Sequence, residues 1–287
     1  MIASNGSKAL VLGGGGVTGV AWMTGLFLGF EEEGVNLGGV GLYLGTSAGS
    51  VVAAQLATGI PLADLFRRQV DAALATPELA PRIRYLRILA HVLPALLVRK
   101  DARAFRKRIG YMALTAKTVE PATRRAVIEA RLPIKDWPDV ALAVAAIDAH
   151  SGELTWFDAG SGVSLVDAVG ASCAVPGVWP PVKIGERVFY DGGIPSPDNA
   201  LRAEGCGSVL IVSPTGVDRS GGVAPRVQRE AAALERGGSR VTIVTPDAES
   251  RASIGRRALD PRFRAPASRA GHAQGRALAG RVRESWT

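Results

Sequence analysis

Short apolar runs and amphipathic stretches alternate along the first fifty residues. Residues 8–12 (KALVL) form an apolar run that stops at four glycines, which is typical of a buried strand followed by a tight loop. Apolar residues recur at helical spacing over residues 19–33, and residues 40–44 form a second apolar run. The pattern predicts a strand, a helix and a second strand, which pack naturally as a right-handed parallel crossover.

The remaining chain contains a helical segment and a second series of strands. Residues 62–131 alternate aliphatic and arginine positions and are divided by prolines, which predicts short helices. Further strands are expected at residues 140–148, 154–157, 188–190, 209–212 and 240–244. The predicted fold class is α/β, with a mostly parallel central sheet flanked by helices and a helical insertion after the second strand.

The pattern is that of one domain. We expect a core at residues 8–212, with the insertion at about 62–131 inside it. Residues 213–287 are expected to complete the same domain and to end in a basic tail, with a basic helix at 267–286. No repeat or low-complexity linker divides the chain.

The composition of the chain indicates the compartment in which the protein works. Of the 287 residues 47% are hydrophobic, which is enough for a sizeable core. Two cysteines, Cys173 and Cys206, are expected in that core rather than in a disulfide framework. The sequence shows no secretory leader and no apolar run of 18 residues. We therefore expect a cytoplasmic protein, with peripheral contact at the inner membrane face as its only membrane contact.

The net charge of +8 is unevenly distributed. Basic segments at 61–131 and 219–287 flank an acidic segment at 132–218. Aromatic residues are few and are not interleaved with the basic clusters, so no nucleic-acid partner is expected. In the insertion, arginines and lysines bracket the apolar run 88–98. Two interpretations stay open: a lid that lies on an anionic membrane, or helices packed on the sheet with solvated arginines.

The strongest chemical motif is a G-x-S-x-G sequence between the second strand and a helix. Gly45 and Gly49 flank Ser47 at the spacing that lets the chain reverse sharply. Such a turn lifts the serine hydroxyl to the positive end of the following helix. Ser47 is therefore the candidate nucleophile.

A nucleophilic serine needs a general base. Asp191 follows a short predicted strand and precedes Gly192 and Gly193, so its carboxylate can project into a cleft. Partial burial would raise its pKa toward that of a useful base. The competing arrangement is an α/β-hydrolase triad, which would have to use His272 with Asp247 or Asp260. It fits poorly, because the nucleophile of an α/β-hydrolase follows several strands, whereas Ser47 follows the second.

The glycine-rich loop after the first strand has two possible uses. Gly14, Gly16 and Gly19 match a weak dinucleotide-binding fingerprint, but the second strand lacks the acidic residue that would hold a ribose. Alternatively, the loop is an oxyanion hole, because consecutive glycines at a helix N-terminus turn their amides toward one point. Adjacent strands would bring this loop and Ser47 to one edge of the sheet.

Four segments together resemble the patatin-like phospholipase family. They are LVLGGGGVTG at 10–19, GTSAG at 45–49, ASCAVPGVWPPV at 171–182 and YDGGIPSPDNA at 190–200. The resemblance implies a three-layer sandwich and a lipid acyl hydrolase with a Ser-Asp dyad and no histidine. It departs at Thr18, where family members usually carry Arg or Lys, which affects anion affinity or loop rigidity.

This resemblance implies Ser47 as nucleophile, Asp191 as general base and the amides of Gly14, Gly15 and Gly16 as the oxyanion hole. The expected substrates are fatty acyl esters of phospholipids or lysophospholipids, cleaved through an acyl-enzyme. No metal or other cofactor is expected, because no His/Cys cluster or EF-hand spacing occurs. A non-catalytic lipid-binding protein and a dinucleotide-binding oxidoreductase are the alternatives.

Overall fold

A central β-sheet organises the protein in a computed structural model, which describes residues 7–37, 39–80, 95, 98, 100–194, 196–255 and 258–286. The strands are β1 (Lys8–Leu12), β2 (Val40–Thr46), β3 (Ala141–Asp148), β4 (Leu154–Phe157), β5 (Val182–Ile184), β6 (Arg187–Asp191), β7 (Ser208–Val212) and β8 (Arg240–Val244). The helices are α1 (Gly16–Glu32), α2 (Ala48–Ala57), α3 (Leu62–Val70), α5 (Ala102–Thr115), α6 (Pro121–Arg131), α7 (Leu165–Ser172), α8 (Pro225–Arg236), α9 (Ala248–Ile254) and α10 (Arg264–Trp286). Short 3-10 turns lie at Ala159–Ser161, Ala200–Ala203 and Pro261–Phe263.

The sheet is parallel through its larger part. Its order is β5-β6-β3-β2-β1-β7-β8, with β4 also paired to β3. Strands β3, β2, β1, β7 and β8 run parallel, whereas β4 and β6 pair antiparallel with β3, and β5 with β6. This confirms the predicted fold class. Strand β5 was not expected, because its three residues follow the Pro180-Pro181 pair, which reads as a strand terminator.

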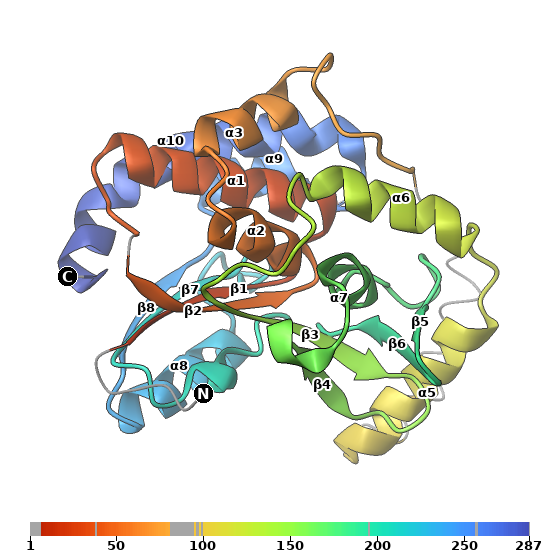
Figure 1. Cartoon of the computed structure of the whole chain (residues 1–287). Helices are drawn as coiled ribbons and strands as arrows, with labels where there is room; N and C mark the ends of the chain where they lie inside the picture. The colour runs from red at the N-terminus through yellow and green to blue at the C-terminus, as the bar shows by residue number, and fades with distance from the viewer. Residues whose placement is uncertain are drawn as a thin grey trace.

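Helices cover both faces of the sheet (Figure 1). Helices α1, α2, α3, α9 and α10 lie on one face, and α8 lies on the other. Alternate residues of the strands divide between the two cores: Leu10 and Val144 pack among α1, α2 and α7, whereas Val11 and Ala143 pack toward α8. Helix α5 packs on the end of β3 through Ile147. The result is the expected three-layer sandwich.

The segment between β2 and β3 is helical beyond α2, as predicted, and includes α3, α5 and α6. Most of the apolar run at 88–98 lies outside the described residues, as do the arginines next to it. The lid hypothesis concerns this segment and therefore also lies outside the described residues. Helix α5 carries four further basic residues of that cluster, and two of them bond to a turn of the core. Arg103 forms an ion pair with Glu153 at 2.8 Å, and Arg106 donates to the Gly152 carbonyl oxygen at 2.5 Å.

Helices α1 and α10 are in backbone contact. A methyl group at Gly25 would lie 1.9 Å from the Ser268 carbonyl oxygen, and one at Gly275 would lie 2.3 Å from the Leu26 carbonyl oxygen. Glycine is therefore required for this approach. Because α10 packs on α1 and β8 extends the sheet beside β7, we infer that residues 213–287 complete the same domain. Within the described ranges, no helix has the length and apolar character needed to cross a bilayer.

Candidate active site

Ser47 occupies a strained turn between β2 and α2. Its φ is 52° and its ψ is −119°, a backbone conformation that non-glycine residues rarely adopt. Tight packing imposes this turn: a methyl group at Gly45 would lie 2.5 Å from Ser50 Cα, and one at Gly49 would lie 1.9 Å from the Leu12 carbonyl oxygen. The two motif glycines thus let the elbow approach its own helix and β1.

Three neighbours hold the main chain of Ser47. Its N–H donates to the Ser172 hydroxyl at 2.8 Å. Its carbonyl oxygen accepts from the Ser50 amide at 2.9 Å and from the Cys173 thiol at 3.2 Å. The cysteine is buried, as predicted, and so is Cys206. The local sequence does not indicate that Ser172 supports the elbow, because this contact joins residues 125 positions apart in the chain.

The register of β3 explains how Ser47 meets Asp191. Consecutive residues of β3, Ala145 and Ala146, pair with Thr46 and with Asp191, which end β2 and β6. The two strand ends therefore lie level with each other on either side of β3, and Ser47, the residue after Thr46, reaches over β3 toward the last residue of β6. The Ser47 hydroxyl donates to Asp191 Oδ2 at 2.7 Å. The structure thus brings together the two side chains that the motifs single out.

The Asp191 carboxylate is buried and has few donors. Burial raises its pKa to about 6, against the opposing effects of hydrogen bonds from the Ser47 hydroxyl and the Gly193 amide and of the Arg124 charge. The Gly193 amide donates to Oδ1 at 2.8 Å. A carboxyl with this pKa is largely ionised at neutral pH and still basic enough to accept a proton.

The glycines after Asp191 serve close packing and carboxylate orientation. A methyl group at Gly192 would lie 2.3 Å from the Ala145 carbonyl oxygen, so the turn passes directly over β3. Asn199 fastens the turn to the elbow, since its amide nitrogen donates to Thr46 Oγ1 at 3.0 Å and to the Gly192 carbonyl oxygen at 3.1 Å. The motif analysis assigned no role to Asn199; its positive φ of 50° is visible only in the structure.

The glycine-rich loop lies against Ser47, with one correction to the expected oxyanion hole. The Gly14 amide donates to the Pro197 carbonyl oxygen at 2.9 Å and is not free for a ligand. Among the residues that the structure describes, the amides of Gly15 and Gly16 have no acceptor, and Gly16 opens α1 with φ of +63°. A methyl group at Gly14 would lie 3.4 Å from Ser47 Cβ, which places the loop beside the serine.

The last two positions of the glycine-rich motif, Thr18 and Gly19, form hydrogen bonds within the fold. Gly19 amide donates to the Gly15 carbonyl oxygen at 2.9 Å and continues the helix. Thr18 is buried, and its amide and hydroxyl lie 3.1 and 3.3 Å from the Ala258 carbonyl oxygen. The side chain therefore ties α1 to the segment before α10 and supplies no positive charge to the site.

The described histidines lie elsewhere. His272 lies 2.7 Å from Glu32 between α10 and α1, and His150 lies in the turn after β3. His91 is outside the described residues. Among the described residues, no group of three or more His, Cys, Asp or Glu side chains is arranged to hold a metal ion.

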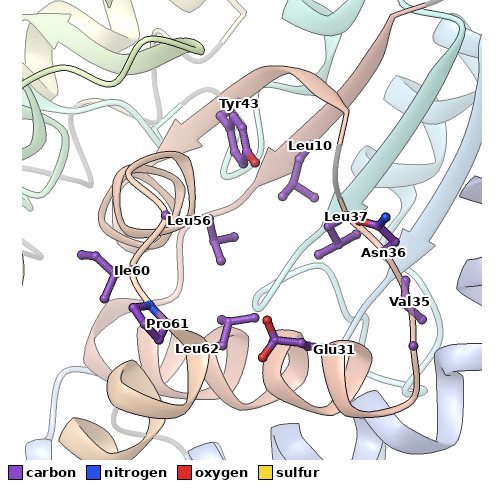
Figure 2. A pocket seen from close by; sticks show the side chains of 12 residues that line it. Leu10, Glu31, Val35, Asn36, Leu37, Tyr43, Leu56, Ile60, Pro61 and Leu62 are labelled. Carbon is purple, nitrogen blue, oxygen red and sulfur yellow. The ribbon is translucent and has the colours of Figure 1, made fainter.

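A large cavity is separate from the serine (Figure 2). Its volume is about 500 Å³, and its lining comes from the ends of α1 and α2 and from the chain leading into α3. Leu56, Ile60 and Leu62 form an apolar wall, and Glu31 carries a carboxylate at the rim. Neither Ser47 nor Asp191 lines it, so this cavity is not the acyl site.

A family model described as "Patatin-like phospholipase" matches residues 10–203. The chain belongs to the patatin-like phospholipase family. It is accordingly a lipid hydrolase by family. The match runs through the glycine-rich loop, the elbow and the strand that ends at Asp191, so the loop belongs to this family's pattern and not to a dinucleotide-binding unit.

Two solved structures of low sequence identity are similar to this patatin-like chain. VipD from Legionella pneumophila is 13% identical, with a TM-score of 0.49 and coverage of 98% of this chain and 68% of VipD. The type III effector protein ExoU is 14% identical, with a TM-score of 0.42 and coverage of 98% of this chain and 54% of ExoU. The chain thus spans about half the length of ExoU. No curated protein sequence gives a significant match.

Proposed function

We propose that this protein is a serine acyl hydrolase that cleaves fatty acyl esters of phospholipids or lysophospholipids. The observation that carries the proposal is the 2.7 Å hydrogen bond from the Ser47 hydroxyl to the buried Asp191 carboxylate, at a strained elbow beside free backbone amides. Membership of the family supports a lipid as the substrate, and the geometry of the site supports the roles proposed for the residues.

In the first half-reaction, Asp191 Oδ2 accepts the hydroxyl proton as Ser47 Oγ attacks the ester carbonyl carbon. The carbonyl oxygen becomes an oxyanion, which the amides of Gly15 and Gly16 stabilise at the N-terminus of α1. Each such donor contributes about 3 kcal/mol to the transition state. Collapse of the intermediate expels the lipid alkoxide, which takes the proton from Asp191, and leaves an acyl-enzyme.

In the second half-reaction, Asp191 accepts a proton from water, and the resulting hydroxide attacks the acyl-enzyme carbonyl. The fatty acid leaves and the proton returns to Ser47 Oγ. One carboxylate serves both steps. Its raised pKa suits this double role, because the group must gain and lose a proton near neutral pH.

Fluorophosphonate labelling and fatty acid release test this function. The wild type should label at one serine and release fatty acid from phospholipid micelles, and Ser47→Ala should lose both. Ser220→Ala is a matched control, because the Ser220 hydroxyl also donates to a carboxylate, Asp218, at 2.6 Å, but on an exposed loop. Label and release that persist in Ser47→Ala would contradict the proposal, and a wild type without either would favour the lipid-binding alternative.

We also propose peripheral contact with anionic membranes through α5. Lys107 and Arg108 are exposed on this helix, and no ion pair is found for them within the described ranges. Charges of this kind attract anionic lipid by about 1 kcal/mol each. Lys107→Glu with Arg108→Glu should weaken binding to phosphatidylglycerol vesicles at low salt, and unchanged sedimentation with vesicles would remove this contact.

A further inference from the structure

Arg124 differs from the two other arginines that are buried among the described residues, Arg131 and Arg264. Arg131 forms an ion pair with Glu78, in which Nε lies 2.8 Å from Oε1. Arg264 donates to Gln69 and to main-chain carbonyl oxygens. Arg124 is only 7% exposed, yet none of its guanidinium nitrogens has an acceptor among the described residues, and Nη1 is fully buried. Two of the three are thus saturated by the fold, and the third is not.

One aromatic contact compensates Arg124 in part. Its guanidinium carbon lies 4.2 Å from the centre of the Trp179 ring, a cation–π geometry. This contact fixes the plane of the guanidinium but satisfies no N–H group. Burial lowers the pKa of Arg124 to about 10, so the side chain remains cationic at neutral pH. A buried cation with unused donors is costly to the fold, and such groups are retained where a ligand completes them.

Arg124 also lines a cavity of about 360 Å³ between α6, α7 and β5. Ile128, Val166 and Val182 give it an apolar wall, and Lys183 adds a second cation at its lining. Arg125, beside Arg124, is occupied by ion pairs with Asp167 and Glu129. Arg124 and Lys183 are therefore the lining cations without an ion pair among the described residues, and of the two only Arg124 is buried.

The same guanidinium acts on the dyad. Burial raises the pKa of Asp191 and that of Cys173, whose thiol donates to the Ser47 carbonyl oxygen, and the Arg124 charge opposes both shifts. Arg124 therefore lies within electrostatic reach of the reacting groups while it faces a cavity. Its planar donor fork matches the oxygens of a phosphate, which it can hold with two parallel hydrogen bonds.

We propose that Arg124 binds the phosphodiester of a glycerophospholipid whose ester carbonyl lies at Ser47, with the head group in the α6–α7–β5 cavity. The phosphate of such a lipid is only a few bonds from its ester carbonyls, which suits a cation near the general base. This inference rests on the proposed function, and it makes Arg124 the residue that selects phospholipids over neutral lipid esters.

Two lipids with identical acyl chains test the assignment: dioleoyl phosphatidylcholine and dioleoylglycerol, in the same detergent micelles at pH 8. At that pH, above the pKa of about 6, Asp191 is ionised in the wild type, and the Arg124 charge is the smallest of the contributions to that pKa. Arg124→Gln should lower kcat/KM for phosphatidylcholine roughly ten- to a hundredfold, mainly through KM, as expected for a lost charge-assisted hydrogen bond. Hydrolysis of dioleoylglycerol should change less than twofold, and Arg124→Lys should recover part of the phosphatidylcholine activity.

Arg229→Gln is the control: Arg229 is exposed on α8, on the opposite face of the sheet, and its substitution should leave both activities unchanged. Inorganic phosphate should compete with phosphatidylcholine in the wild type and should leave hydrolysis of dioleoylglycerol unchanged, because only the phospholipid uses Arg124; no competition would show that the site does not hold a free anion. The thermal midpoint of Arg124→Gln should not fall, because the substitution removes an uncompensated buried charge.

Equal losses on both lipids would overturn the assignment and make Arg124 a support of Asp191 or of the fold. No loss on phosphatidylcholine would also overturn it. The proposed function fails separately, if Ser47→Ala retains hydrolysis of both lipids. A wild type that cleaves dioleoylglycerol but not phosphatidylcholine would preserve the serine hydrolase and reject the phosphate site.

Discussion

The Ser47 hydroxyl donates to the Asp191 carboxylate across 2.7 Å, although 144 positions separate the two residues in the chain. The contact depends on β3, whose neighbouring residues Ala145 and Ala146 hold the ends of β2 and β6. Among the residues that the structure describes, no imidazole takes part in the contact, because His150 and His272 lie elsewhere. The pair should act as a unit.

The first prediction concerns that unit. Asp191→Asn keeps the shape of the side chain but cannot accept the Ser47 proton, so kcat/KM should fall by about 10⁴-fold, close to the loss in Ser47→Ala. The double variant should be no worse than either single variant. Release of fatty acid from phospholipid micelles measures this, with circular dichroism to check the fold. Losses that multiply in the double variant would mean that the two residues act independently.

The second prediction concerns pH. Asp191 must be ionised to accept a proton, and burial raises its pKa to about 6. Activity should therefore fall about tenfold per pH unit below 6 and level off above it. A soluble neutral ester is the suitable substrate, because its own charge does not change with pH. An inflection near 4, the value of an exposed aspartate, would show that the carboxylate is solvated in the working enzyme.

The third prediction concerns Asp198, which is buried behind the glycine-rich loop. A methyl group at Gly13 would lie 1.9 Å from its Oδ1, and burial raises its pKa to about 7. Because the folded state holds the proton more tightly than the unfolded state, this group costs no stability below about pH 4. It destabilises the fold progressively as pH rises to about 7.

Asp198→Asn should remove that pH dependence. The free energy of unfolding of the wild type should decline between pH 4 and pH 7 by roughly 2–4 kcal/mol through this group, and the variant should decline less. Urea unfolding at several pH values measures both slopes. Equal slopes would mean that Asp198 is stabilised as a carboxylate by its surroundings.

The fourth prediction compares two glycines of α10. Gly275 faces the Leu26 carbonyl oxygen, where a methyl group would lie at 2.3 Å, whereas no atom lies within 4 Å of a methyl group at Gly280. Gly275→Ala should destabilise the protein by about 1–3 kcal/mol through overpacking. Gly280→Ala should be neutral or stabilise it by up to about 1 kcal/mol, because alanine favours the helix. Thermal midpoints that shift equally would show that α10 can slide on α1.

Local patterns were sufficient for most of the fold. The strands expected at 8–12, 154–157 and 240–244 coincide with β1, β4 and β8, because short apolar runs between turns have few other uses. Strand β5 escaped prediction, since a three-residue strand after two prolines has no periodicity of its own. The dyad was predictable because each partner carries glycines that a sharp turn requires.

Other features of the site depend on tertiary contacts that no local pattern encodes. The Gly14 amide is taken up by the Pro197 carbonyl oxygen, a contact between segments 183 positions apart. Ser172 and Asn199 resemble ordinary capping and turn residues in the sequence. Arg124 is one of many arginines in a basic segment, and only its burial without an acceptor separates it from solvated neighbours.

The glycine contact between α1 and α10 has a consequence for control of the enzyme. Helix α1 starts at the amides proposed to bind the oxyanion, and α10 packs along α1. The 23 residues of α10 supply no reacting group, yet they hold the electrophilic end of the site in place. A molecule that separated α10 from α1 would displace these amides and abolish hydrolysis, without touching Ser47 or Asp191.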